Sequence, residues 1–117
     1  MEPVVYAYSG CGTCRKALQW LQARRIHPKV LAIRETPPSR QDLEKAFAQV
    51  GNLKTLFNVS GGDYKDLGLK DRLSDLTTSE ALDLLASRGN LVKRPFVQVG
   101  SRYLVGFRED QWEEAFS

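Results

Sequence analysis

The two cysteines of this chain, Cys11 and Cys14, stand three residues apart, between an apolar run and a helical pattern. The run Val4–Tyr8 is short and rich in β-branched and aromatic residues, which predicts a buried strand. The apolar residues of Gly12–Arg25 recur at helical spacing. Cys11 is therefore expected at the tip of a helix, with Cys14 one turn further along the same face. A C-x-x-C pair at a strand-to-helix corner is typical of a thioredoxin-like redox motif.

A helix N-terminus favours a thiolate, because its backbone N–H groups are unpaired and carry partial positive charge. Cysteine pKa values at such positions fall to about 3.5–7.5, which suits attack by Cys11 and resolution by Cys14. Three other readings of the pair remain open. A zinc site needs four ligands, and only His27 would add a nitrogen donor, so we expect no metal; a structural disulfide would close a very small loop. The third reading is a pair of inert, buried thiols, although Gly10 and Gly12 favour exposure of the two cysteines.

Composition and charge limit the class of protein. With 117 residues, of which 42% are hydrophobic, the chain is expected to form one domain, residues 1–117. A net charge of +3 is mild; it does not require nucleic acid and suits a small anionic ligand. No apolar run approaches the roughly 18 residues that would span a membrane. The first residues lack the basic segment of a secretory signal, so we expect a cytoplasmic protein in a reducing compartment.

The remaining patterns predict a βαβ unit, a helical insertion over about residues 39–90, and a ββα unit. The second strand, Val30–Ile33, is expected to lie parallel to the first, with a right-handed crossover. Further signals are an N-cap at Ser39, a helical break near Gly68, a capping box from Thr77 to Glu80, a helix end at Gly89 and a hairpin turn at Gly100-Ser101. This order predicts an α/β, thioredoxin-like fold with a mixed four-stranded sheet.

A second cluster of candidates lies opposite the cysteines in such a fold. Pro95 precedes the third strand, where a proline is often cis and would lie beside the two thiols. The backbone N–H groups of Gly12 and Thr13 would cradle an anion, and guanidinium groups match oxyanions with two hydrogen bonds. The candidate cations are Arg15, Arg94 and Arg108, with Lys54 as a fourth. For each arginine, the alternative is a solvated surface charge.

Four segments resemble the arsenate reductase family that couples to glutaredoxin, especially its C-G-T-C branch of Spx-type regulators and uncharacterised relatives. They are Tyr8–Ala17, Leu56–Gly61, Tyr64–Leu69, and Arg94-Pro95 with Val105–Arg108. The resemblance covers essentially the whole chain. It implies that Cys11 attacks arsenate, that glutathione then forms a mixed disulfide, and that glutaredoxin resolves it. It also implies that Arg94 and Arg108 hold the oxyanion, with Lys54 near the position of a third arginine.

Cys14 stands where these reductases carry a serine, so the resemblance also allows an internal Cys11–Cys14 disulfide. One implied function is a thiol oxidoreductase that reduces an oxyanion or a disulfide, with no bound cofactor. Its electron donor would be glutathione, glutaredoxin or thioredoxin. The alternative is an Spx-like redox-sensing regulator that binds RNA polymerase and makes no direct contact with nucleic acid. A third possible function is that of a binding module, in which the disulfide has no functional role.

Overall fold

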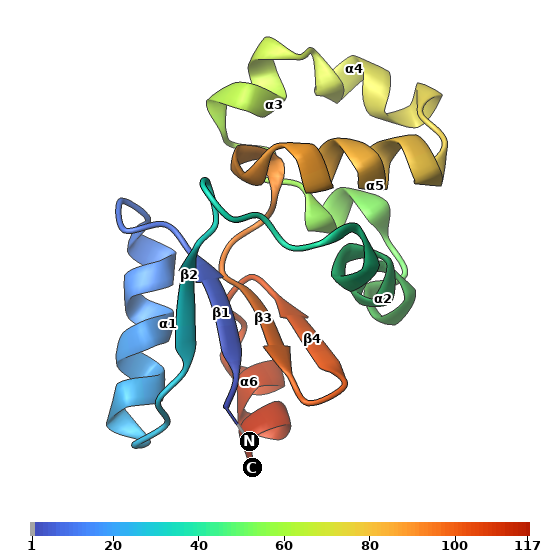
Figure 1. The fold of residues 1–117 in the computed structure, drawn as a ribbon. Helices are drawn as coiled ribbons and strands as arrows, with labels where there is room; N and C mark the ends of the chain where they lie inside the picture. The colour runs from blue at the N-terminus through green and yellow to red at the C-terminus, as the bar shows by residue number, and fades with distance from the viewer. Residues whose placement is uncertain (1) are drawn as a thin grey trace.

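The computed structural model describes residues 2–117. Met1, the first residue of the segment in which we expected no secretory signal, lies outside the described residues. Four strands form one sheet in the order β2-β1-β3-β4 (Figure 1). Their bounds are β1 Val4–Ala7, β2 Lys29–Ala32, β3 Phe96–Val99 and β4 Arg102–Val105. β1 pairs with β2 in parallel, whereas the pairs β1–β3 and β3–β4 are antiparallel. The predicted thioredoxin-like fold, with its mixed four-stranded sheet, is confirmed.

Helices α1 (Gly12–Ala23) and α6 (Glu109–Phe116) cover one face of this sheet. Val5 and Val97 are among the sheet residues that pack against them, and Cys14 lies in the same cluster. The rings of Trp20 in α1 and Trp112 in α6 meet edge to face, 5.7 Å apart. Such aromatic pairs contribute beyond the apolar area that they bury. The buried residues of α1, from Cys14 in its first turn to Leu21, hold the helix against the sheet along most of its length.

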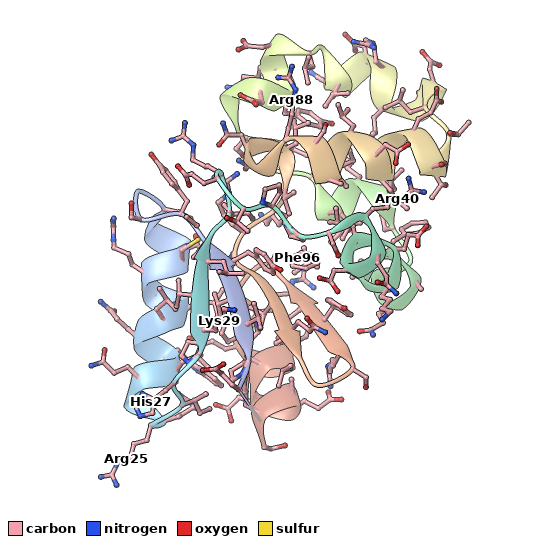
Figure 2. The ribbon with its side chains drawn as sticks, viewed as in Figure 1. Arg25, His27, Lys29, Arg40, Arg88 and Phe96 are labelled. Atoms are coloured by element: carbon pink, nitrogen blue, oxygen red, sulfur yellow. The ribbon has the colours of Figure 1, made fainter. Side chains whose placement is uncertain are left out.

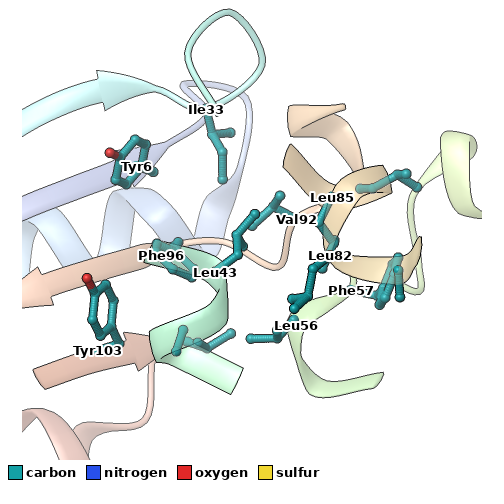
Figure 3. Packing of buried hydrophobic residues seen from close by; sticks show 14 of the residues in the cluster. Tyr6, Ile33, Leu43, Leu56, Phe57, Leu82, Leu85, Val92, Phe96 and Tyr103 are labelled. Carbon is teal, nitrogen blue, oxygen red and sulfur yellow. The ribbon is translucent and has the colours of Figure 1, made fainter. Parts of the chain in front are cut away.

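The opposite face carries the helical segment between β2 and β3. On this side, the sheet residues Tyr6, Phe96 and Tyr103 pack with Leu43, which belongs to the first helix after β2 (Figure 3). The elements are α2 (Arg40–Val50), η1 (Leu53–Leu56), α3 (Gly62–Asp66), α4 (Leu69–Arg72), η2 (Leu73–Asp75), α5 (Thr78–Ser87) and η3 (Gly89–Leu91). Figure 1 shows α3, α4 and α5 beyond the same end of the sheet as the loop between β1 and α1.

Several local predictions are confirmed. The Ser39 hydroxyl accepts a hydrogen bond from the Asp42 N–H, so it caps α2. The capping box between Thr77 and Glu80 is present in both directions. Gly68 separates α3 from α4 with a φ of 64°, a left-handed conformation that favours glycine. β3 and β4 are joined through Gly100-Ser101, as Val99 pairs with Arg102.

Two predicted helix ends were wrong. We expected the first helix to run from Gly12 to Arg25, but α1 stops at Ala23, and Arg25 turns the chain with a φ of 58°. We expected Gly89 to cap α5, but that helix ends at Ser87, and Gly89 is buried in η3. A Cβ atom on Gly89 would lie 1.8 Å from the carbonyl oxygen of Ile33. Glycine is needed there because two backbone segments touch. Other boundaries shift by one or two residues, as frayed ends commonly do.

Within residues 2–117, no helix combines the length and the apolar character needed to cross a membrane.

Candidate functional site

Cys11 is the N-cap residue of α1, at the end of the loop that follows β1. Its Sγ accepts a hydrogen bond from the Cys14 N–H at 3.4 Å, and its own N–H donates to the Tyr8 carbonyl at 3.0 Å. Both cysteines are free thiols. Cys11 is partly exposed, whereas Cys14 is only 1% exposed. The arrangement gives one thiol that a reactant can approach and a second, buried thiol one helical turn further on. The prediction that both thiols are exposed is therefore confirmed for Cys11 and was wrong for Cys14.

The two thiols have opposite electrostatic environments. Partial burial raises the pKa of Cys11, but hydrogen bonds from Cys14 and Thr13 and the positive charge of Arg94 outweigh it, so that this pKa is lowered overall. Burial raises the pKa of Cys14 to about 11, and the hydrogen bond to Cys11 and the negative charge of its thiolate add to that rise. Cys11 is therefore the thiol that ionises more readily, and Cys14 keeps its proton at neutral pH.

The alkylation rate of Cys11 is expected to follow the formation of its thiolate, with a midpoint at a lower pH than that of the same cysteine in the unfolded chain. The rate should fall as the pH drops through the pKa of Cys11, because the thiol form is a poor nucleophile. Cys14 should stay unmodified until the pH approaches about 11. Iodoacetamide labelling followed by peptide mass measurement gives both profiles. The same labelling in denaturant supplies the reference, and a Cys11 midpoint equal to that reference would contradict the assignment.

Arg94 lies beside the cysteines and ties down the chain before β3. Its Nε donates to the Val92 carbonyl at 3.3 Å, and its Nη2 donates to the carbonyls of Gly89 and Asn90 at 3.2 and 2.9 Å. The Arg94-Pro95 peptide bond is cis, as predicted. The charge of Arg94 acts on both thiols. Arg94 thus connects the end of the helical segment to the redox site.

The other candidate cations are placed differently. The exposed Arg15 donates from Nη1 to the Ser9 carbonyl at 3.0 Å and so braces the loop between β1 and α1. Arg108 and Lys54 line a cleft of about 780 Å³ between η1, β4 and the start of α6. Thr13 also lines that cleft, which therefore reaches the first turn of α1. The structure puts Arg94 next to the thiols, and Arg108 and Lys54 in a cationic cleft that begins at Thr13.

A second hollow, of about 430 Å³, lies beside Cys14 and is also lined by Tyr8 and Ser9 of the loop between β1 and α1. Apolar side chains from α1 and β2, including Leu18 and Val30, line much of it. Val30 is half exposed there. The buried Cys14 thus borders a largely apolar hollow, whereas the cationic cleft reaches the first turn of α1 at Thr13.

Tyr8 and Arg34 are site residues that sequence reasoning missed. Tyr8 follows β1, and the guanidinium carbon of Arg34 lies 4.9 Å from the centroid of its ring. The sequence predicted Tyr8 as the last residue of the first strand and placed Arg34 directly after the second strand, Val30–Ile33. One signal could have found them: neighbouring parallel strands end at the same edge of a sheet, so the residues that follow β1 and β2 are neighbours.

Metal-binding side chains do not gather in the part of the chain that the structure describes. No group of three or more His, Cys, Asp or Glu residues there is arranged to hold an ion.

The ArsC family model matches residues 6–115 of this chain. YusI, an uncharacterized protein of Bacillus subtilis (strain 168), is 44% identical over 115 residues, which cover 97% of this chain and 98% of YusI. An arsenate reductase of Escherichia coli is 32% identical over 94 residues, or 80% of this chain, and the match spans 65% of that reductase. The regulatory protein MgsR of Bacillus subtilis (strain 168) is 24% identical over 103 residues, covering 87% of this chain and 80% of MgsR.

A solved structure of an ArsC family related protein from Bacteroides fragilis has a TM-score of 0.92 to this chain and is 36% identical. The likeness covers 98% of both chains, so it includes the sheet, both helical layers and the loop that carries Cys11. The family match extends over nearly the same residues. By its sequence and its fold, this chain belongs to the ArsC family.

Proposed function

We propose that this chain is a thiol oxidoreductase of the arsenate-reductase-like kind, which reduces an oxyanion or a disulfide through Cys11, with Cys14 as the resolving thiol. The observation that carries the proposal is the stacking of the two thiols at the start of α1. Cys11 caps the helix and is accessible, and Cys14 lies buried one turn below, with its N–H on the Cys11 sulfur. A helix N-terminus stabilises the Cys11 thiolate both when it attacks the substrate and when it is released again as a leaving group.

With a disulfide substrate, the Cys11 thiolate attacks one sulfur, and the other sulfur leaves as a thiolate. This step turns the negatively charged Cys11 into a neutral mixed disulfide, which removes one cause of the raised Cys14 pKa. Cys14 can then lose its proton and attack the Cys11 sulfur, releasing the second half of the substrate. The product is a Cys11–Cys14 disulfide, and two electrons from glutathione, glutaredoxin or thioredoxin restore both thiols.

With an oxyanion, the electrons balance in a similar way. Reduction of arsenate to arsenite takes two electrons and releases one oxygen as water. Cys11 and a second thiol, from glutathione or from Cys14, supply the electrons by ending as a disulfide. Arg94 would hold the anion beside Cys11, and Gly12, Thr13 and Arg15 would contribute from the first turn of α1. Arg108 and Lys54 would act from the cleft that Thr13 also lines. The name of the Escherichia coli relative supports this branch.

A redox-sensing regulator is the second candidate. The buried resolving thiol and the regulatory relative MgsR favour it. In that function, closing the Cys11–Cys14 disulfide changes the surface at the start of α1 and thereby the contact with RNA polymerase. Capture of the polymerase by the reduced and the oxidised protein tests it, since failure of both forms to bind would remove this candidate.

The enzyme proposal is tested by turnover. Reduced protein is incubated with arsenate, glutathione and glutaredoxin, and oxidation of glutathione is followed through NADPH and glutathione reductase. In parallel, the protein is titrated with peroxide, and the mass of the peptide that holds Cys11 and Cys14 shows whether a disulfide has formed. Arsenate turnover supports the oxyanion branch, and a disulfide that glutaredoxin or thioredoxin reduces supports the other. Fully reduced protein that shows neither reaction would contradict both branches.

A further inference from the structure

The edge of the sheet that carries Cys11 also carries an arginine that plays no part in the function proposed above. The parallel register of β1 and β2 pairs Ala7 with Ala32, and the Ile33 N–H donates to the Ala7 carbonyl at 2.9 Å. Tyr8 and Arg34, which come just after these positions, therefore leave the sheet at the same edge. The guanidinium carbon of Arg34 lies 4.9 Å from the centroid of the Tyr8 ring.

The Tyr8 ring has a fixed place in the loop. A Cβ atom on Gly10 would lie 2.6 Å from Cε2 of Tyr8, so the ring rests directly on the glycine backbone. The carbonyl of Tyr8 accepts the N–H of Cys11 at 3.0 Å. The ring that supports Arg34 is thus part of the same short loop that positions the nucleophile.

Arg94 approaches the same ring, with its guanidinium carbon 5.8 Å from the centroid. The charge of Arg34 acts unfavourably on Arg94. Within residues 2–117 neither arginine forms an ion pair with a carboxylate. Nε and Nη2 of Arg94 are engaged with backbone carbonyls, whereas its Nη1 has no hydrogen-bond partner in the described chain. Two like charges therefore lie over one aromatic ring, and neither is paired with a carboxylate, so a bound anion would lower their mutual repulsion.

We propose that Arg34 is a specificity-determining residue, which together with Arg94 favours reactants that carry a negative charge close to the atom that Cys11 attacks. Arg34 offers five N–H donors in a planar fork, the geometry that matches a carboxylate or an inorganic oxyanion. Because Arg34 is exposed, its main effect is expected on the rate at which anionic reactants reach Cys11. This inference rests on the proposed role of Cys11 as the nucleophile.

Two disulfide probes that differ in charge test it. The probes are 5,5′-dithiobis(2-nitrobenzoate), with one carboxylate on each half, and 4,4′-dithiodipyridine, which is neutral. All variants carry Cys14→Ser, so that Cys11 is the only thiol in the chain. In each reaction, the Cys11 thiolate forms a new bond to one sulfur of the probe, and the bond between the two probe sulfurs breaks. The nitrobenzoate half leaves as a thiolate, and the pyridine half takes up a proton from water to give the thiopyridone; absorbance follows both. The ratio of the two second-order rates cancels any change in the pKa of Cys11, since both probes need the same thiolate.

Arg34→Gln is expected to lower the ratio of anionic to neutral rates roughly three- to tenfold at low salt, with a smaller effect at high salt because ions screen exposed charges. Arg34→Lys keeps the charge and should keep most of the preference. The matched control is Arg25→Gln, which removes the same charge at the C-terminal end of α1, far from the loop between β1 and α1 (Figure 2). It should leave the ratio unchanged.

The outcomes separate the two proposals. An equal ratio in the parent protein and Arg34→Gln, or an equal loss in Arg25→Gln, would overturn the role of Arg34 while leaving Cys11 as the nucleophile. A parent protein in which Cys11 reacts with neither probe would overturn the proposed function and this inference together. A lysine variant as poor as the glutamine variant would also overturn it, because the preference would then not follow the charge.

Discussion

Purified Cys11→Ser protein is expected to lose every thiol-dependent reaction, whether arsenate turnover, disulfide reduction or formation of the internal disulfide. The reason is positional, because Cys11 is the thiol that caps α1 and can be approached from solvent. Cys14 cannot take over, since it is 1% exposed and its pKa is about 11. A serine hydroxyl at the N-cap preserves the helix end, so the loss would be chemical and not a loss of folding. Circular dichroism checks that the variant is folded.

Cys14→Ser is the matched variant, because it removes a thiol from the same helix and leaves the nucleophile in place. If glutathione resolves Cys11, this variant should keep turnover while losing the internal disulfide. If Cys14 resolves Cys11, turnover should fall and the mixed disulfide between Cys11 and its substrate should accumulate, which intact-protein mass measurement detects. Unchanged turnover together with an unchanged response to peroxide would show that Cys14 is not the resolving thiol.

Among the proposed substitutions, Gly89→Ala is expected to lower the free energy of unfolding most, by roughly 3 kcal/mol or more. The new methyl group would lie 1.8 Å from the Ile33 carbonyl oxygen, and backbone on both sides cannot give way as a flexible side chain would. For a domain of this size, such a loss lowers the Tm by roughly 10–15 °C. The variant should also lose Cys11 reactivity, because the Gly89 carbonyl accepts a hydrogen bond from Arg94.

Gly62→Ala provides the comparison, since nothing lies within 4 Å of a Cβ atom at that position in α3. Alanine there should leave the Tm unchanged or raise it, because it restricts the unfolded chain and favours a helix. Thermal unfolding followed by circular dichroism measures both variants. Equal Tm values for Gly89→Ala and Gly62→Ala would show that the backbone approach at Gly89 imposes no such constraint.

The parts of the fold that the sequence predicted are those set by residues close together in the chain. The start of α1 follows from its apolar spacing and the cap at Cys11, and the start of α5 follows from the capping box between Thr77 and Glu80. The role of Gly89 was not predictable in this way, because it depends on contact with Ile33, which lies far away in sequence. A glycine just beyond a helix looks the same whether it caps the helix or admits a neighbouring backbone.

In the candidate site, too, the features set by residues close together in the chain were predictable, and those that depend on distant contacts were not. The spacing of Cys11 and Cys14 gives the helix cap and the second thiol beneath it, because both lie within one turn of one helix. Which arginines reach the thiols depends on strand register and on the path of loops. Arg94 could be expected from its place before β3, whereas Arg34 reaches Tyr8 only through the pairing of β2 with β1. Long side chains leaving neighbouring strands cannot be placed without that register.

The pairing of Trp20 with Trp112 has a spectroscopic consequence. These are the two tryptophans of the chain, and both belong to the layer formed by α1 and α6, the layer that also contains Cys14. Intrinsic fluorescence excited at the tryptophan band therefore reports on that layer, and the helices between β2 and β3 contribute nothing to it. Far-ultraviolet circular dichroism, in contrast, reports on the helices of both layers. Coincident curves from the two signals would mean that the redox layer and the helical segment unfold as one unit, and a separation would show which of them opens first.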